Sequence, residues 1–284
     1  MSTSNLKFIF FGTPDVASKT LTILKDRGYI PELIVTSPDK SSGRGLLMHE
    51  TPVSLFAKEN NIECLKPEKI TEEFISKLST FNFQLSIVVA YGKILPESLI
   101  KTPKFGTINI HYSLLPKYRG ASPVETALLN GDELTGISIQ QMEYKLDSGP
   151  ILIEEEMKVS INDTKEELLS DLINLGANCL CDLLPGIESK NVIPKKQDES
   201  LVTFCKKIKK EDGEINIEGD QKENWNKYRA FFGWPGVFFF TIKKDKRIRV
   251  KVVEAIYENN SFIIKRVVPE GRKEMSYDEF LRWN

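Results

Sequence analysis

Three polar residues in the middle of the chain have the types and the spacing that group-transfer chemistry needs. Asn109 and His111 alternate along the end of an apolar segment, so in a strand both side chains would lie on one face. An amide beside a histidine suits transfer through a tetrahedral oxyanion, because the amide stabilises the developing charge and the imidazole moves protons near neutral pH. Asp147 follows the next predicted strand, at what we expect to be another carboxyl edge, where it would orient the imidazole.

Each of these residues also has a structural explanation when it is taken alone. A histidine at a strand end is often structural, and an aspartate before Ser-Gly often only makes a turn. The polar, proline-broken loop between them, residues 113–120 (SLLPKYRG), makes the combination more specific than its parts. In an open parallel sheet, sites lie beyond the carboxyl ends of the strands, which is where we expect Asn109 and His111 to emerge.

The composition argues against several other kinds of site. The chain has only two histidines, so a histidine-built metal site has almost no ligands, and we expect no metal. A single glycine, Gly12, follows the first predicted strand instead of Gly-x-Gly-x-x-Gly, and there is no P-loop, so neither NAD nor ATP binding is indicated. The cysteines lack CxxC spacing and are interpreted as free structural thiols: Cys64, Cys179, Cys181 and Cys205.

Short apolar segments alternate with amphipathic ones through the first two-thirds of the chain. The predicted strands are Leu6 to Phe11, Glu32 to Thr36, Leu85 to Ala90, Thr107 to Ile110 and Ile137 to Met142. The predicted helices are Asp15 to Arg27, Pro52 to Asn60, Thr71 to Ser79, Ser122 to Leu129 and Thr164 to Leu184. This alternation predicts a doubly wound α/β domain with a mostly parallel sheet, Rossmann-like but without the dinucleotide motif.

The last third of the chain has a different pattern. We expect a catalytic domain over residues 1–188, a linker over 189–204 and a small β-rich domain over 205–284. Residues 205–284 hold 18 Lys and Arg against 13 Asp and Glu, whereas the rest of the chain holds 21 against 27. The weak positive charge of the small domain has two explanations: the domain binds a polyanionic partner, or it has a lysine-rich surface that is only solvated. Its predicted strands form a small antiparallel sheet or barrel: Val237 to Ile242, Arg247 to Val253 and Phe262 to Val267.

No apolar segment reaches the roughly 20 residues of a membrane span, and the first seven residues do not resemble an export signal. We therefore expect a cytoplasmic protein without membrane contact. The sequence indicates no obligate protein partner, so a monomer is one option.

Several motifs occur together in an order that is typical of one family. They are FxGTPDxA at Phe10 to Ala17, SPDKxxGRG at Ser37 to Gly45, VVAYGKILP at Val88 to Pro96, NIHxSLLPxxRGASP at Asn109 to Pro123, LDSG at Leu146 to Gly149 and RAFxxWPG at Arg229 to Gly236. On these motifs, which span most of the chain, the sequence resembles the folate-dependent formyltransferases that use 10-formyltetrahydrofolate.

The resemblance implies a catalytic set of Asn109, His111 and Asp147 and a formyl group supplied by 10-formyltetrahydrofolate as co-substrate. No cysteine lies in the motifs, so direct transfer to a primary amine is expected, without a thiol-bound intermediate. The residues expected to border the folate are Lys93, Ile94, Leu95, Ser113, Leu114, Leu115, Pro116, Glu143, Tyr144, Lys145 and Leu146.

Members of the family differ in the amine that they formylate: methionyl-tRNA, an amino sugar nucleotide or glycinamide ribonucleotide. Residues 37–49 resemble the loop that, in tRNA-directed members, enters the acceptor-stem region of initiator tRNA. The resemblance thus implies methionyl-initiator tRNA as partner and formylmethionyl-tRNA, used to initiate translation, as product. The expected tRNA contacts are Lys40, Arg44, Lys206, Lys207, Lys209 and Lys210.

The segment after the WPG motif is shorter than is typical of tRNA-directed members, which predicts a reduced OB-like barrel. This shortening leaves a sugar-nucleotide N-formyltransferase as the alternative, although residues 43–45 (GRG) are a feature of the tRNA-directed members. A non-catalytic relative that binds folate or RNA is a third interpretation. Phe238 to Phe240 either stack on bases or pack in the core of the small domain.

Overall fold

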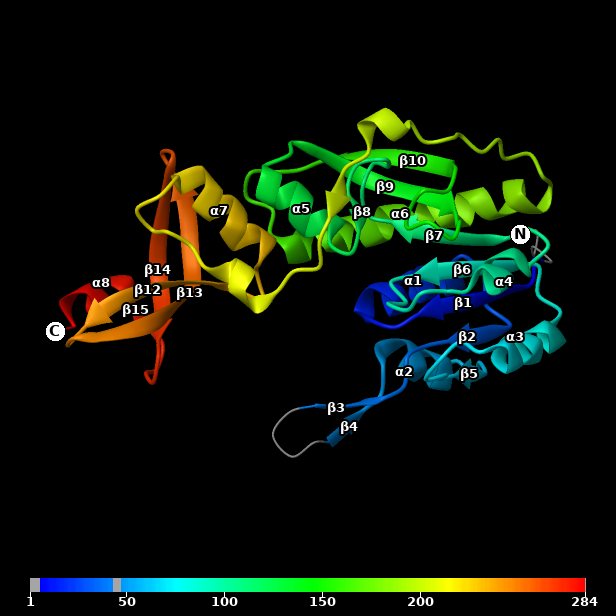
Figure 1. Ribbon diagram of the computed structural model, residues 1–284, viewed down its shortest axis with the longest axis horizontal. Coiled ribbons are helices and arrows are strands. Elements are labelled where there is room, and N and C mark those ends of the chain that lie inside the picture. Colours follow the sequence, from blue (N-terminus) through cyan, green and yellow to red (C-terminus); the bar gives the residue numbers. More distant parts are fainter. Residues whose placement is uncertain (1–5, 43–46, 284) are drawn as a thin grey trace. The chain divides into compact units, whose positions relative to one another are not determined.

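The computed structural model describes residues 6–42 and 47–283. The strands of its largest sheet are β1 (Phe8–Gly12), β2 (Leu33–Val35), β5 (Cys64–Leu65), β6 (Leu85–Val89), β7 (Thr107–His111), β9 (Leu134–Gln141) and β10 (Ile151–Lys158). Their order is β10-β9-β7-β6-β1-β2-β5 (Figure 1). The five strands from β5 to β7 pair in parallel, whereas β9 is antiparallel to β7. The mostly parallel α/β sheet that the sequence predicts is confirmed.

Helices separate the strands as the alternating pattern predicts. They are α1 (Asp15–Asp26), α2 (Pro52–Glu59), α3 (Glu72–Leu78), α4 (Glu97–Lys101), α5 (Pro123–Asn130) and α6 (Lys165–Glu188). Local signals set several starts: the Thr51 side chain accepts a hydrogen bond from Ser54 N, and Thr71 accepts one from Phe74 N. Gly131 ends α5 in the left-handed conformation that glycine adopts readily.

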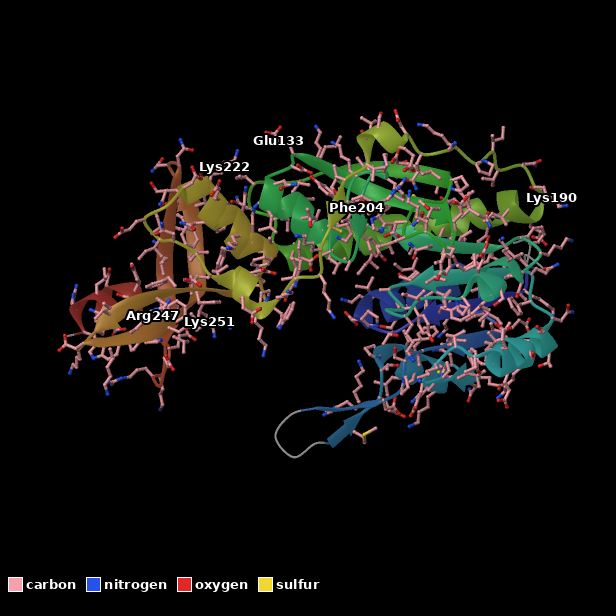
Figure 2. All side chains as sticks on the ribbon, in the orientation of Figure 1. Glu133, Lys190, Phe204, Lys222, Arg247 and Lys251 are labelled. Carbon is pink, nitrogen blue, oxygen red and sulfur yellow. The ribbon has the colours of Figure 1, made fainter. Side chains whose placement is uncertain are left out.

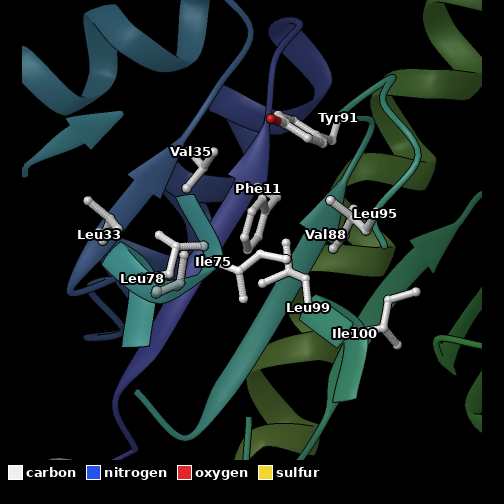
Figure 3. Packing of buried hydrophobic residues seen from close by; sticks show 11 residues of the cluster. Phe11, Leu33, Val35, Ile75, Leu78, Val88, Tyr91, Leu95, Leu99 and Ile100 are labelled. Atoms are coloured by element: carbon white, nitrogen blue, oxygen red, sulfur yellow. The ribbon is translucent and has the colours of Figure 1, made fainter. Parts of the chain in front are cut away.

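One face of the sheet is covered by α3 and α4 through an apolar cluster (Figure 3). β1, β2 and β6 have near-continuous apolar sequences, as is typical of parallel strands buried on both faces. The cluster also includes Tyr91, whose ring meets the edge of Phe11 with the ring centroids 5.6 Å apart. Its buried members are Ile9, Phe11, Leu33, Val35, Ile75, Leu78, Val88, Tyr91, Leu95, Leu99 and Ile100.

The opposite face of the sheet is packed by α1 and α6. A side-chain carbon on Gly176 of α6 would lie only 3.0 Å from Ile110, so the helix backbone comes close to β7 at that point. The two helices are joined at their surface, where Arg27 of α1 and Asp182 of α6 form an ion pair of 2.6 Å. Since Ile110 alternates with Asn109 and His111, α6 covers the face of β7 away from these two residues.

Two short antiparallel strands, β3 (Lys40–Ser42) and β4 (Leu47–His49), form a ribbon that projects from the sheet region (Figure 1). An ion pair of 2.8 Å between Asp39 and Lys66 ties the start of the ribbon to the segment after β5. The ribbon belongs to the segment in which the sequence predicts a loop that contacts tRNA.

A second sheet lies in the C-terminal part of the chain, with the order β12-β13-β14-β15. Its elements are β12 (Val237–Lys243), β13 (Lys246–Glu258), β14 (Ser261–Pro269) and β15 (Met275–Ser276), preceded by α7 (Gln221–Ala230) and followed by α8 (Tyr277–Arg282). All neighbouring strands in it are antiparallel, which confirms the predicted small antiparallel sheet. Both hairpin turns, at residues 244–245 and 259–260, have two positive φ angles, the geometry that fits the twist of paired strands.

The chain divides into two compact units that interleave along the sequence. One comprises residues 1–119, 136–156 and 171–203, and the other comprises residues 120–135, 157–170 and 204–284. The boundary falls within α6 and at the paired short strands β8 (Arg119–Gly120) and β11 (Phe204–Cys205). The domain boundaries that the sequence predicts, at residues 188 and 204, stay a prediction.

Single-turn 3-10 helices occur at Ser79–Phe81, Glu199–Leu201 and Lys210–Gly213.

Replacing Leu99 with alanine tests the contribution of the apolar cluster to stability. Leu99 is fully buried, so Leu99→Ala removes packing and leaves a cavity, and we expect the free energy of unfolding to fall by about 2–5 kcal/mol. Urea denaturation measures this change. Ile30→Ala is the matched control, because Ile30 is 59% exposed and should cost much less. Equal losses in the two variants would contradict the packing described here.

Candidate active site

Asn109 and His111 lie on one face of β7, where a row of side chains across the sheet changes from apolar to polar. In strand register, Val35 pairs with Phe11, Phe11 with Val88 and Val88 with Asn109. The row continues to Gln140 of β9, which pairs with Asn109. Its first members belong to the apolar cluster, whereas Asn109 and Gln140 carry amides. The buried face therefore becomes polar at β7, beside the histidine.

The imidazole of His111 is buried and has an oxygen near each ring nitrogen. Its side chain is 6% exposed. Nε2 lies 2.9 Å from the carbonyl oxygen of Tyr118, and because a carbonyl can only accept, Nε2 carries the hydrogen in this contact. Nδ1 lies 3.8 Å from Oδ2 of Asp147. One hydrogen bond, from Nε2 to the Tyr118 carbonyl, therefore orients the ring, and the Asp147 carboxylate lies within ion-pair distance of Nδ1.

Asp147 reaches this place by a route that the sequence did not predict. We expected it at another carboxyl edge, but that expectation is wrong, because β9 runs antiparallel to β7 and ends at the opposite edge. The loop after β9 therefore returns toward His111. Gln140, which is buried, donates a hydrogen bond of 3.0 Å from Nε2 to Oδ1 of Asp147 and leaves Oδ2 facing the imidazole.

Two amide groups in this region have open hydrogen-bonding capacity. Oε1 of Gln140 is buried and has no hydrogen-bond partner within residues 6–42 and 47–283. The half-buried side chain of Asn109 likewise has no recorded hydrogen bond within the described part of the chain. Buried polar groups in native proteins are nearly always paired, so these amides are suited to bind a polar ligand.

Ser138 holds the loop that follows β7. It pairs with His111 across the strands and is fully buried. Its hydroxyl accepts a hydrogen bond of 2.9 Å from Leu115 N and donates one of 2.8 Å to the Ser113 carbonyl. The Ser113 hydroxyl in turn donates to the Lys117 carbonyl at 2.7 Å. This network fixes the beginning of the loop whose residue Tyr118 contacts the imidazole.

The residues expected to border the folate lie in three segments of one compact unit. Lys93 donates hydrogen bonds of 2.6 and 2.8 Å to the carbonyl oxygens of Pro67 and Glu68, and partial burial lowers the pKa of its ammonium. Ile94 is 85% exposed, whereas Leu95 is buried in the apolar cluster. In the second segment, Ser113 and Leu115 are buried, and Leu114 and Pro116 are half-buried.

The third segment, residues 143–146, is exposed throughout. Tyr144 and Leu146 present apolar side chains that are 67% and 62% exposed. Lys145 forms an ion pair of 3.4 Å with Glu199, and Glu143 is exposed. Exposed apolar groups beside a buried polar site suit an aromatic ligand that would cover them. The folate contacts remain a prediction.

Sequence reasoning missed several residues that support this site. Gln140, Ser138 and Gln197 were not singled out, although Gln140 and Ser138 occupy the strand expected to lie beside the catalytic segment, on alternate positions. Because the alternation of β9 was visible, it could have shown that these two share a face. Gln197 had no such signal, because it lies in a polar segment without periodicity.

The expected tRNA contacts fall at separate places in the chain. Lys40 is exposed at the start of β3, whereas Arg44 lies outside the described residues. The lysines expected to contact RNA are exposed on the segment after β11: Lys206, Lys207, Lys209 and Lys210. They remain predicted contacts.

Basic side chains of β13 lie over aromatic side chains of β12 in the same compact unit. The guanidinium carbon of Arg249 lies 3.7 Å from the centre of the Phe238 ring, and that of Arg247 lies 3.9 Å from the centre of the Phe240 ring. Phe239 points to the other face, where its ring meets those of Tyr277 and Phe280. Of the three consecutive phenylalanines, Phe238 and Phe239 are buried and Phe240 is exposed, and the rings of Phe238 and Phe240 each carry an arginine. Figure 2 labels Arg247 and Lys251 on β13.

Among the described residues, no three His, Cys, Asp or Glu side chains gather in a way that could hold a metal ion. Likewise, across residues 6–42 and 47–283, every helix is too short or too polar to cross a bilayer.

With this geometry in place, comparison with known proteins identifies the class. The chain belongs to the formyl transferase family: residues 5–184 match the model described as "Formyl transferase", and residues 207–262 match the one described as "Formyl transferase, C-terminal domain". It is therefore an enzyme that transfers formyl groups. Among its curated relatives is "Methionyl-tRNA formyltransferase" of Thermodesulfovibrio yellowstonii, which is 36% identical over 293 residues, covering 96% of this chain and 94% of the relative.

Two solved structures share the fold. The methionyl-tRNA formyltransferase of Clostridium thermocellum has a TM-score of 0.60 at 18% identity and covers 93% of this chain and 98% of its own. The N-formyltransferase of Helicobacter canadensis, solved with folinic acid and dTDP-3-aminofucose, has a TM-score of 0.66 at 19% identity and covers 89% of this chain and 88% of its own.

Replacing Ser138 tests the network that holds the loop after β7. Ser138→Ala leaves the buried N–H of Leu115 without its acceptor, so we expect the free energy of unfolding to fall by about 1–3 kcal/mol. Urea denaturation measures the loss. Ser148→Ala is the control, because the Ser148 hydroxyl makes an exposed hydrogen bond to the Lys145 carbonyl and its loss should cost less. A Ser138→Ala variant as stable as the parent would refute this role.

Proposed function

We propose that this enzyme transfers the formyl group of 10-formyltetrahydrofolate to the α-amino group of methionyl-initiator tRNA. The observation that carries the proposal is the placement of the Asn109 amide and the buried His111 imidazole on one face of β7, with the Asp147 carboxylate 3.8 Å from Nδ1 of the imidazole, in a member of the formyl transferase family. Full-length relatives named methionyl-tRNA formyltransferase support the acceptor. The product, formylmethionyl-tRNA, serves translation initiation.

The co-substrate fits the character of the site. The exposed apolar side chains of Ile94, Tyr144 and Leu146 suit the ring system of a folate. The open amides of Asn109 and Gln140 suit its polar groups and the formyl oxygen. The Helicobacter canadensis relative, solved with folinic acid, supports a folate as the formyl donor.

The reaction is a direct acyl transfer between two nitrogens. The unprotonated amine attacks the formyl carbon, a new C–N bond forms, and the carbonyl oxygen becomes an oxyanion. The Asn109 amide donates a hydrogen bond to this oxygen. The bond from the formyl carbon to N10 then breaks, and His111 moves the proton lost by the amine to N10. The products are tetrahydrofolate and the formylated amine. Asp147 orients the imidazole and stabilises its cation.

Two basic regions are proposed to bind the tRNA. Lys40 and Arg44 belong to the segment that resembles the acceptor-stem loop of tRNA-directed relatives. The lysines between residues 206 and 210 provide positive charge on a surface of the other unit, which is proposed to follow the phosphate backbone of the RNA. Arg247 and Arg249, stacked on aromatic rings, add oriented guanidinium groups suited to phosphate.

Substitutions in the catalytic set test the chemistry. Asn109→Ala, His111→Ala and Asp147→Ala should each lower kcat by about 10²-fold or more, because each removes oxyanion stabilisation or positioned proton transfer. The assay follows labelled formyl from 10-formyltetrahydrofolate to methionyl-initiator tRNA, with thermal unfolding as a check of folding.

The exposed Asn191→Ala serves as the control and should keep the parent rate. Unchanged kcat in all three catalytic variants would refute the assignment of the site. The parent protein is also offered a panel of amino sugar nucleotides. Formylation of a sugar instead of the tRNA would keep the chemistry and replace the acceptor, and tight folate binding with no transfer would indicate a non-catalytic relative.

Charge reversal tests the docking surface. The double variant Lys206→Glu/Lys207→Glu should weaken tRNA binding and make the dependence of log K on log salt shallower by roughly 1 per lysine, since each lysine would no longer neutralise a phosphate. Filter binding across a salt series measures both effects. Lys195→Glu/Lys196→Glu, the same charge change on an exposed segment outside the surface, is the control. Equal affinity and slope in the parent and the test variant would exclude these lysines from docking.

A further inference from the structure

Both groups that face the His111 imidazole belong to residues with unusual backbone geometry. Tyr118, whose carbonyl accepts from Nε2, has a φ of 60°, and Asp147, whose carboxylate faces Nδ1, has a φ of 48°. Neither is glycine, so both occupy a left-handed region that L-residues rarely adopt. Such conformations persist only where the surrounding structure holds them.

Gln197 contacts the Asp147 turn directly. Its side chain is buried, although the segment that contains it is otherwise exposed from residue 193 to residue 201. Its Nε2 donates hydrogen bonds of 3.0 Å to the carbonyl of Asp147 and 2.7 Å to that of Gly149. One amide thereby fixes both ends of the short turn that carries the catalytic carboxylate.

The other end of the same amide is held by Arg119. Oε1 of Gln197 accepts hydrogen bonds from Nε and Nη2 of Arg119, at 3.0 and 2.7 Å. Arg119 is fully buried and also pairs with Glu199 at 2.7 Å, a contact that lowers the pKa of the Glu199 carboxyl. Arg119 directly follows Tyr118, so Gln197 binds both Asp147 itself and the residue next to Tyr118.

The backbone of Tyr118 is tied to the same segment. Tyr118 N donates to the hydroxyl of Thr203 at 2.9 Å, and Arg119 N donates to the carbonyl of Thr203 at 2.9 Å. Residues 197–203 therefore hold Asp147 from one side and Tyr118 from the other. The sequence predicted this segment as part of a linker, which would need none of these contacts.

We propose that Gln197 is a positioning residue for formyl transfer and that residues 197–203 act as a strap that fixes the two oxygens around His111. This inference rests on the proposed function of the His111–Asp147 pair. The hydrogen bonds of the Gln197 side chain go to Arg119, Asp147 and Gly149 and not to the imidazole. Gln197 acts by holding the Asp147 turn and the Tyr118 carbonyl at fixed positions beside the imidazole ring.

The test begins with Gln197→Leu in the full chain. The variant removes both donated hydrogen bonds while approximately keeping side-chain volume, so Asp147 loses its backbone anchor. We expect kcat to fall by roughly 10- to 100-fold, because small misplacements of catalytic groups are costly. The KM values for the formyl donor and for the tRNA should stay within about threefold, since neither would lose a contact of its own.

A second variant distinguishes a loss of activity from a loss of folding. Gln197→Glu keeps oxygen acceptors for Arg119, but an ionised carboxylate cannot donate to the carbonyls of Asp147 and Gly149. It should therefore lose kcat as Gln197→Leu does, while its kept contact with Arg119 gives it a thermal unfolding midpoint above that of Gln197→Leu. Lys196→Gln, an exposed neighbour outside the strap contacts, is the matched control and should keep the parent kcat.

A spectroscopic measurement separates this proposal from the choice of acceptor. The chain has two histidines, so the imidazole ¹⁵N signals of His111 can be assigned by comparison with His49→Gln. In Gln197→Leu and Gln197→Glu, these signals should shift because the oxygens at Nε2 and Nδ1 move. The unliganded protein suffices, so this readout stands even if methionyl-tRNA is not the substrate.

The outcomes decide the proposal. A loss of kcat at nearly constant KM in Gln197→Glu, with shifted His111 signals, supports it. A kcat within twofold of the parent in either folded variant, a loss expressed only in KM, or unchanged His111 signals would each overturn it. A parent protein that formylates no tRNA, together with shifted His111 signals, would refute the proposed acceptor and support the strap.

Discussion

The fixed position of one imidazole is the constraint on which the site depends. His111 ends a strand in the middle of the sheet, so its Cβ is set by the fold, but its ring still needs partners on both nitrogens. Those partners come from the loop after β7 and the loop after β9, and each is offered by a residue with positive φ. Backbone strain of this kind costs about 1–3 kcal/mol per residue, which the contacts around each loop must offset.

The sheet itself explains why polar chemistry is placed at β7. Toward β2 the row of side chains is apolar and covered by α3 and α4, so it contributes to the core. At β7 the row continues with the amides of Asn109 and Gln140. Here an antiparallel strand replaces the parallel order, and the chain leaves β9 at the edge opposite to His111. A returning loop becomes necessary, and that loop brings Asp147 over the face that carries the histidine.

Prediction from sequence worked where local patterns determine structure and was incomplete where distant segments meet. Apolar runs predicted the strands that became β1, β2, β6 and β7, and helical spacing predicted α1 to α3. β10 was missed because its sequence IEEEMK is half exposed and polar, and α7 because its polar sequence has little apolar periodicity. The sequence predicted the polar segment around Gln197 to be a linker. Its contacts with Arg119 and Asp147 join residues that are 78 and 50 positions apart in the chain, and such distant contacts leave no local sequence pattern.

The same reasoning distinguishes what can vary in such an enzyme from what cannot. The face proposed to be catalytic requires fixed geometry, and it lies on a buried strand and is held by buried glutamines and a buried arginine. Recognition of a large polyanion tolerates variation, because each phosphate contact adds a modest, salt-dependent share of affinity. The exposed arginines of β13 illustrate this second kind of construction: the rings of Phe238 and Phe240 orient Arg249 and Arg247 without burying them. A short C-terminal sheet can therefore lose strands and still present oriented charge, since each Arg–Phe pair spans only two neighbouring strands.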